Sequence, residues 1–159
     1  MKRLAVAYLC ALFCLGSIAV PVTSSARTVS HVESWKAFFA QILPASNGKF
    51  AAILGDKAPG HLNDNYYAVN ADLDSTFVKN CTIDSNTYWS LFCVDLPEYV
   101  GATSRDQLVA DITAALPSTF VQSVSTTGTL RWTSGHTIIF LVSPQSLTDD
   151  WGISLGNDS

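Results

Sequence analysis

The sequence predicts an α+β fold of two layers, in which two main helices cover one face of an antiparallel sheet of about five strands. Two segments have apolar residues at helical spacing, and at least five short segments have the alternation or the apolar runs of strands. The strands follow one another through short turns, which favours antiparallel pairing. The expected order of elements is α-(α)-β-β-α-β-β-β(-β), with one cross-strand disulfide.

Residues 1–26 have the layout of a secretory signal peptide. Lys2 and Arg3 precede an uncharged apolar run, and small residues that end at Ala26 follow it. We therefore expect cleavage after Ala26 and a secreted or periplasmic protein formed by one domain, residues 27–159. A retained membrane anchor is the alternative, because the apolar run is nearly long enough to span a bilayer.

The expected mature domain is acidic. Removal of Lys2 and Arg3 leaves seven basic and 13 acidic residues, so the formal net charge is −6. No basic cluster remains, which argues against nucleic acid and against an anionic membrane surface as partners. No second long apolar run follows the leader, so we expect no stable membrane insertion after cleavage.

The first main helix is predicted over about residues 32–43. Trp35, Phe38 and Phe39 recur at helical spacing and are expected in the core, and Pro44 should stand just past the helix end.

A short second helix can follow over residues 46–55 and end at Gly55, the residue type preferred at a left-handed helix exit. Residues 56–76 are rich in Pro, Gly, Asn and Asp, which predicts a long irregular connection. Loops of that length inside a compact domain are often functional.

The second main helix is predicted over residues 103–117. Ser104 and Gln107 have the spacing of a capping box, and Leu108 and Ile112 belong to its apolar stripe.

The remaining strands lie in the last 40 residues. Residues 120–124, 129–133 and 136–144 predict strands, the last two joined by a turn at Gly135. The third of them is apolar at both parities and is therefore expected in the middle of the sheet. Residues 150–156 alternate as a strand with one buried face should.

Cys81 and Cys93 are predicted to form a disulfide across a hairpin. Each cysteine shares its strand parity with apolar neighbours, so both point to the buried face, and a turn near residues 86–88 brings them opposite each other. Exported chains meet an oxidising environment, where such pairs close. The spacing does not fit a redox motif, and no zinc-ligand set accompanies it.

No motif of the mature chain indicates a catalytic or metal site. The three histidines, His31, His61 and His136, lie far apart in sequence, and no nucleophile elbow, P-loop or dinucleotide glycine pattern is present. The acidic loop residues lack the spacing of an EF-hand. We therefore expect no catalytic residues, no bound metal and no cofactor.

The candidate binding residues are Tyr66, Tyr67, Tyr88 and Phe92. Tyr88 and Phe92 have the parity opposite to Trp89, so they belong to the sheet face that a two-layer fold leaves open. Tyr66 and Tyr67 belong to the 56–76 connection, which either covers that face or leaves it exposed as a partner site.

Three functional hypotheses follow from these observations. The first is an exported, non-catalytic protein-binding domain, inhibitor- or immunity-like, whose partner is another envelope or secreted protein. The second is a small envelope hydrolase that uses His61 with Asp64 or Asp72, which requires a cleft at His61. The third is a carrier of small apolar ligands, which requires an apolar cavity between the helices and the sheet.

Overall fold

The computed structural model describes residues 23–58, 65–73, 78–86, 88–100, 104–144 and 151–157, with side chains from His31 onward. Most of the expected signal peptide lies outside these residues. The expected cleavage site after Ala26 falls within the first turns of the first helix, and the cleavage remains a prediction.

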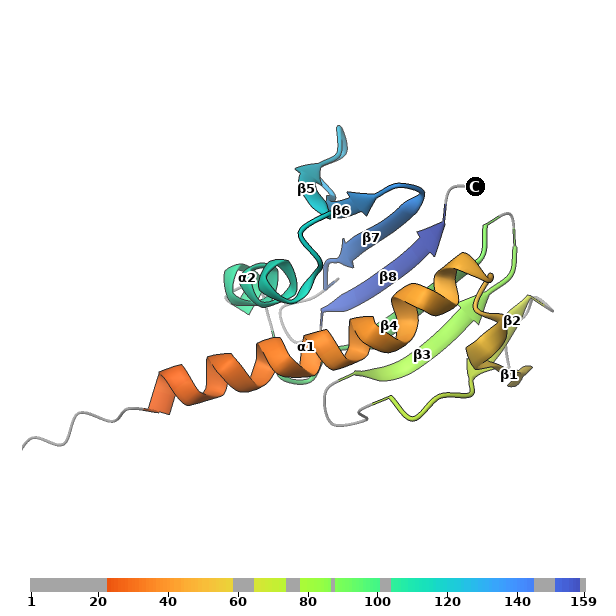
Figure 1. Ribbon diagram of the computed structural model, residues 1–159, viewed down its shortest axis with the longest axis horizontal. Helices are drawn as coiled ribbons and strands as arrows, with labels where there is room; N and C mark the ends of the chain where they lie inside the picture. Colours follow the sequence, from red (N-terminus) through yellow and green to blue (C-terminus); the bar gives the residue numbers. More distant parts are fainter. Residues whose placement is uncertain are drawn as a thin grey trace, which may run out of the picture.

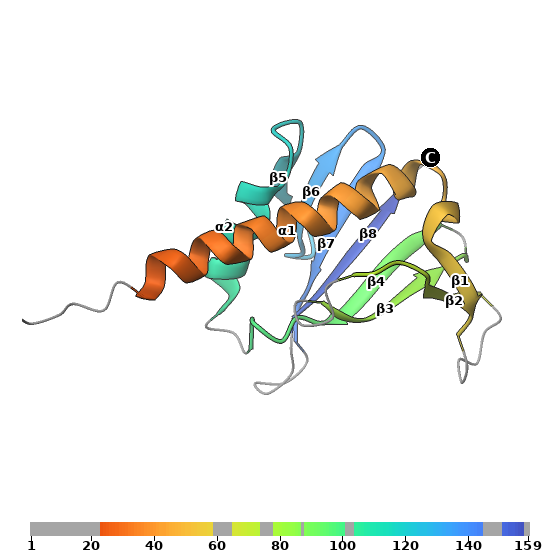
Figure 2. The same ribbon diagram turned by 60° about the horizontal axis from the view of Figure 1, so that its bottom comes forward.

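The chain forms one antiparallel sheet with both main helices on the same face, as Figures 1 and 2 show. This arrangement confirms the α+β fold, although the sheet has eight strands and not about five. The elements are α1 (Thr23–Asn47), a 3₁₀ turn η1 (Ala51–Ile53), β1 (Leu54–Lys57), β2 (Tyr66–Val69), β3 (Lys79–Asp84), β4 (Ser90–Asp95), α2 (Arg105–Ala115), β5 (Val121–Val124), β6 (Leu130–Ser134), β7 (Thr137–Val142) and β8 (Gly152–Asn157).

The sheet is built from two halves of the same design. In each half a helix is followed by four strands that pair in sequence order, and the spatial order is β1-β2-β3-β4-β8-β7-β6-β5. The last strand of each half therefore lies at the centre, where β4 and β8 pair antiparallel. The predicted order, with two strands before the second helix, was wrong because it missed β1 and β2.

β2 and the end of β1 occupy the segment 56–76 that was expected to be an irregular connection, and β1 begins within the expected short helix. They pair antiparallel, with Leu54 opposite Val69, and β2 continues onto β3. Gly55 is a strand residue here and does not end a helix. The left-handed conformations that follow α1 belong to Lys49 and Phe50, and Phe50 is fully buried. The large apolar Phe50 side chain therefore turns into the core and redirects the chain toward the sheet.

Helix α1 is longer than its apolar pattern indicates. It begins at Thr23 and continues through Pro44 to Asn47, where an end at residue 43 was expected. Proline lacks one backbone donor but tolerates helical dihedrals. Pro44 stands near the last turn of α1, and the two helix residues that follow it, Ala45 and Ser46, are buried. Trp35, Phe38 and Phe39 are buried, as the helical spacing predicted.

The helices pack on the inner face of the sheet, defined here as the face that carries the buried strand residues. Its central row takes one residue from each of seven strands, in the spatial order β2-β3-β4-β8-β7-β6-β5. These residues are Tyr67, Ile83, Leu91, Leu155, Ile139, Trp132 and Gln122. At the β5–β6 end, the Trp132 indole N–H donates to the Thr113 hydroxyl of α2 over 3.0 Å. Thr113 in turn bonds the Gln122 side chain.

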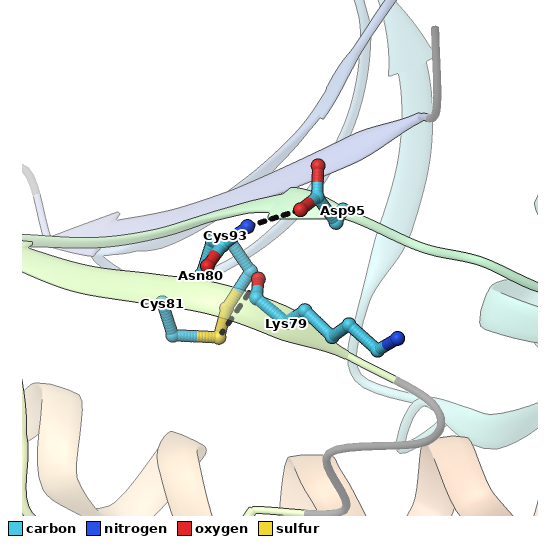
Figure 3. The surroundings of a disulfide bond; sticks show 5 residues. All are labelled: Lys79, Asn80, Cys81, Cys93 and Asp95. Carbon is cyan, nitrogen blue, oxygen red and sulfur yellow. Dashed lines mark hydrogen bonds between the residues drawn. A yellow bond between two sulfur atoms is a disulfide. The ribbon is translucent and has the colours of Figure 1, made fainter.

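The Cys81–Cys93 disulfide is present and joins β3 to β4, as Figure 3 shows. The two cysteines lie directly opposite each other in the strand register, and Cys93 is fully buried. Beside them the Asn80 amide donates to the Asp95 carboxylate. A bridge over so short a loop adds about 3 kcal/mol to stability in the chain-entropy model.

Candidate functional site

The outer face of the sheet, opposite the helices, is not covered by any of the described residues. Its side chains align in two rows that cross seven strands. One row consists of Tyr66, Asp84, Ser90, Gly156, Ile138, Thr133 and Val121. The other consists of Ala68, Thr82, Phe92, Ser154, Phe140, Arg131 and Ser123.

A groove runs along β8 in the middle of this face. Strand β8 presents only Gly152, Ser154 and Gly156 to the outer side, so it forms a low floor between its neighbours. The groove has a volume of about 340 Å³ and a mostly apolar lining. Its lining residues are Tyr88, Ser90, Ile138, Phe140, Ser154, Gly156 and Asn157.

The walls of the β8 groove are apolar and accessible. Ile138 and Phe140 line it from β7, and Tyr88 and Ser90 line it from the β4 side, where Phe92 lies opposite the floor residue Ser154. Ile138, Phe140 and Phe92 are half-buried, and Tyr88, just before β4, is 61% exposed. Aromatic and aliphatic side chains that stay in contact with water can gain free energy when a partner covers them.

Charges lie on the two flanks of the groove and not within it. Asp84 of β3 and Arg131 of β6 are half-buried, and each lies two strands away from β8, on opposite sides. The Asp84 carboxylate accepts a hydrogen bond from the backbone N–H of Asn86 over 2.9 Å. The Arg131 Nε donates to the Ser123 hydroxyl over 3.1 Å. One flank is therefore negative and the other positive.

The structure places three of the four predicted binding residues on the outer face. They are Tyr66, Tyr88 and Phe92, of which Tyr88 lines the groove. Tyr67 lies on the inner face, where its ring stacks on Trp89 with centroids 6.3 Å apart. The 56–76 segment was expected either to cover the outer face or to leave it open; its described part leaves that face open, and its strand β2 extends the sheet.

Ile138, Phe140 and the floor of the groove were not among the predicted binding residues. The run around Ile138 did indicate a central strand with apolar residues on both faces, and β7 lies between β6 and β8. The sequence signal for the floor was the small residue at every second position of residues 152–156. That pattern indicates a groove floor only once β8 is known to lie between β4 and β7.

The densest polar cluster lies on the other side of the sheet, between α1, α2 and the turn at Tyr99. The Tyr99 hydroxyl donates to Asp111 over 2.8 Å and accepts from the Trp35 indole over 3.0 Å. The Gln107 amide donates to the second Asp111 oxygen over 2.8 Å. His31 lies 3.6 Å from Asp111, and its ring meets Tyr99 edge-on.

This cluster is enclosed and acts as a tie between elements. Only 1% of Asp111 and of Tyr99 is exposed, so a substrate has no access to either group. Burial raises the pKa of Tyr99 well above its ordinary value, and the hydrogen bond to Asp111 raises it further. Gln107 and Ser104 were expected to form a capping box. Gln107 instead donates its hydrogen bond to Asp111, and the Ser104 side chain makes no cap hydrogen bond at the start of α2.

The predicted hydrolase residues do not assemble into a site within the described ranges. His61 and Asp64 lie outside the described residues, and Asp72 is exposed just after β2. Across the residues that the structure describes, no group of three His, Cys, Asp or Glu side chains could hold a metal ion. None of the described helices is long and apolar enough to cross a membrane.

Comparison of the chain with protein-family models, with curated proteins and with solved structures gave no match.

Proposed function

We propose that the chain is an exported, non-catalytic binding domain that holds a partner protein against the outer face of its sheet. The observation that carries this proposal is the apolar β8 groove, with Ile138 and Phe140 half-exposed along its β7 side and Tyr88 exposed on its β4 side. A partner that covers these side chains gains about 25 cal/mol for each Å² of apolar surface removed from water. Aromatic anchors at the centre of a patch are typical of binding hot spots.

The chemistry of the groove supports binding rather than catalysis. Its lining offers the hydroxyls of Tyr88, Ser90 and Ser154 and the amide of Asn157, and the described part of the lining contains no carboxylate or imidazole. A serine nucleophile needs an adjacent base to be activated. Neither serine of the lining has one among the other lining residues, so these groups serve as hydrogen-bond partners for a bound chain.

The volume of the groove favours a second candidate, a carrier of small apolar ligands. About 340 Å³ lies at the lower end of the range of ligand pockets, and the lining is uncharged. The groove lies on the outer face, whereas the carrier hypothesis had placed its cavity between helices and sheet. An apolar ligand here would remain partly in contact with water, which reduces its affinity relative to an enclosed cavity.

The test compares four proteins produced from the full-length sequence and purified from the exported fraction. They are the wild type, Phe140→Glu, Ser154→Leu and the control Val121→Glu. Phe140→Glu places a charge in the groove wall, and Ser154→Leu fills the floor without adding charge. Val121 lies on the same face but at the edge strand β5 and is 65% exposed, so Val121→Glu adds the same charge away from the groove.

Each protein is immobilised and exposed to an envelope or secretion extract, and circular dichroism verifies that each variant is folded. We expect the wild type and Val121→Glu to retain the same protein in stoichiometric amount, and both groove variants to lose it. Equal retention by all four proteins would contradict the proposal. Binding of an environment-sensitive apolar dye by the wild type, lost in Ser154→Leu without any protein partner, would favour the ligand carrier.

A further inference from the structure

We infer that the partner on the outer face is a second copy of this chain, so that two sheets pack face to face through their β8 grooves. This inference rests on the proposed function, because it requires the outer face to be a protein-binding surface. Two features of the face carry it: its side chains are arranged almost symmetrically about β8, and its charges are complementary to themselves under a two-fold rotation.

The symmetry follows from the two-half design of the sheet. Because β4 and β8 end their respective halves, β8 is flanked by two strands that both present bulky side chains outward. Phe92 of β4 and Phe140 of β7 lie opposite the same floor residue, Ser154. Val142 lies opposite Gly152 in the same way. The face thus consists of two apolar ridges, along β4 and along β7, with a groove between them.

Ridges and a groove of this kind fit a copy of themselves. When a second sheet is turned over about an axis that is parallel to β8 and lies between β7 and β8, the β7 ridge of each copy can enter the β8 groove of the other. The Phe140 ring of one copy then covers Ser154 and Gly156 of its partner, where the absence of larger side chains leaves room. Inner faces of packed sheets interdigitate in this way at about 10 Å separation.

The charges select the direction of the two-fold axis. Asp84 and Arg131 lie two strands from β8 on opposite sides, and they are the charged residues of the two outer rows defined above. With the axis between β7 and β8, Arg131 of one copy lies over β4 of the other, one strand from Asp84, so opposite charges approach each other twice per dimer. An axis across the strands would instead place Asp84 near Asp84 and Arg131 near Arg131. Complementary charges at an interface fix register and exclude wrong arrangements.

Both charged groups are held in place before any partner arrives. The backbone N–H of Asn86 fixes one oxygen of the Asp84 carboxylate, and Ser123 fixes the Nε of Arg131. A carboxylate accepts further hydrogen bonds, and a guanidinium has four more N–H donors. Groups that are already ordered lose less entropy on association.

The first experiment measures the oligomeric state of the exported protein by sedimentation equilibrium over a range from 1 to about 100 μM. We expect a monomer–dimer equilibrium for the wild type and for Val124→Glu, which adds the same charge on the inner face at the edge strand β5, where Val124 is 61% exposed. Phe140→Glu should raise the dissociation constant about 100-fold, because the charge enters the central contact twice. Ser154→Leu, which fills the groove without adding charge, should also dissociate the dimer if it remains folded.

The decisive experiment exchanges the two charges. Asp84→Lys alone and Arg131→Glu alone should each raise the dissociation constant about tenfold, because each places like charges on facing flanks. The double variant restores opposite charges in the reversed order, so its dissociation constant should return to within a few-fold of the wild type. Losses that add in the double variant would overturn the inference, because an effect on folding or on another partner would not be rescued.

A failure of this inference can be told apart from a failure of the proposed function. A wild type that stays monomeric at the highest concentration overturns the second copy as partner. If Phe140→Glu then still loses a protein captured from the extract, the outer face binds a different protein and the proposed function stands. If the wild type is monomeric and captures no protein, both are overturned.

Discussion

Among single residues, Tyr99 shows how a buried polar group connects three parts of the chain. Its hydroxyl accepts a hydrogen bond from the indole N–H of Trp35 in α1 and donates one to the Asp111 carboxylate in α2. Gln107 completes the hydrogen bonding of the same carboxylate. Buried polar groups are tolerated when they are paired in this way, and removal of one member leaves the others with a desolvation cost of about 1–3 kcal/mol.

The raised pKa of Tyr99 predicts a loss of stability in base. An unfolded tyrosine ionises near pH 10, whereas the buried hydroxyl stays protonated. Above pH 10 the folded state therefore holds more protons than the unfolded state, and the free energy of unfolding falls as pH rises. Tyr99→Phe should be less stable than wild type at pH 8, and the difference between the two should shrink by about 1.4 kcal/mol at pH 11.

Urea unfolding of both proteins at pH 8 and pH 11 measures this change. The other tyrosines and the lysines are common to the two proteins, so their titration cancels in the comparison. A difference that stays constant between the two pH values would mean that Tyr99 ionises as readily in the folded protein as in the unfolded chain.

At the level of elements, β8 depends on glycine for two different reasons. A Cβ built on Gly152 would lie 2.9 Å from the carbonyl oxygen of Cys93 and 3.3 Å from the Cβ of Val142. A Cβ on Gly156 would meet its nearest atoms at 3.6 Å, an ordinary contact. Gly152 is therefore required where the two halves of the sheet join, while Gly156 mainly keeps the groove floor low.

Replacing each glycine by alanine separates the two roles. Gly152→Ala should lower the free energy of unfolding by about 1–3 kcal/mol, because the added methyl group pushes β8 away from the backbone of β4. Gly156→Ala is the matched control and should change it by less than about 1 kcal/mol. Urea unfolding at one fixed protein concentration measures both, and equal losses would show that close approach at Gly152 is not the cause.

On the scale of the whole molecule, the two halves of the sheet share one core. Helix α1 precedes β1–β4 in the sequence but packs against α2, β7 and β8, which belong to the second half. The buried apolar side chains of all the elements accordingly form a single cluster. Figure 2 shows α1 lying across the strands of the second half. Neither half can bury its apolar surface without the other.

We therefore predict that the halves do not fold alone. A fragment that ends at Val100 and a fragment that begins at Ser104 should each lack a cooperative thermal transition by circular dichroism, since each leaves half of the core exposed to water. Mixed in equal amounts, they should recover strand signal and a transition. A cooperative transition in either isolated fragment would show that the half-sheet is an independent unit.

By itself the sequence determined the elements whose pattern is local. Helical spacing placed Trp35, Phe38 and Phe39 in the core, strand parity put Cys81 opposite Cys93, and a central strand was expected around Ile139. These features depend on which face a side chain takes within its own helix or strand. That property follows from the 3.6- and 2-residue periods of the backbone.

Only the tertiary structure decided the features that depend on strands far apart in the chain. The strands β1 and β2 have four residues each, which is too short for a pattern to stand out, and they are completed by the pairing of β1 with β2 and of β2 with β3. Tyr66 and Tyr67 could not be separated before the pairing of β2 was known. The groove exists because β8 inserts between β4 and β7, which brings residues 92, 140 and 154 together. The helical and strand periods of the sequence do not predict which strands become neighbours. That arrangement results from the burial of both halves in one core.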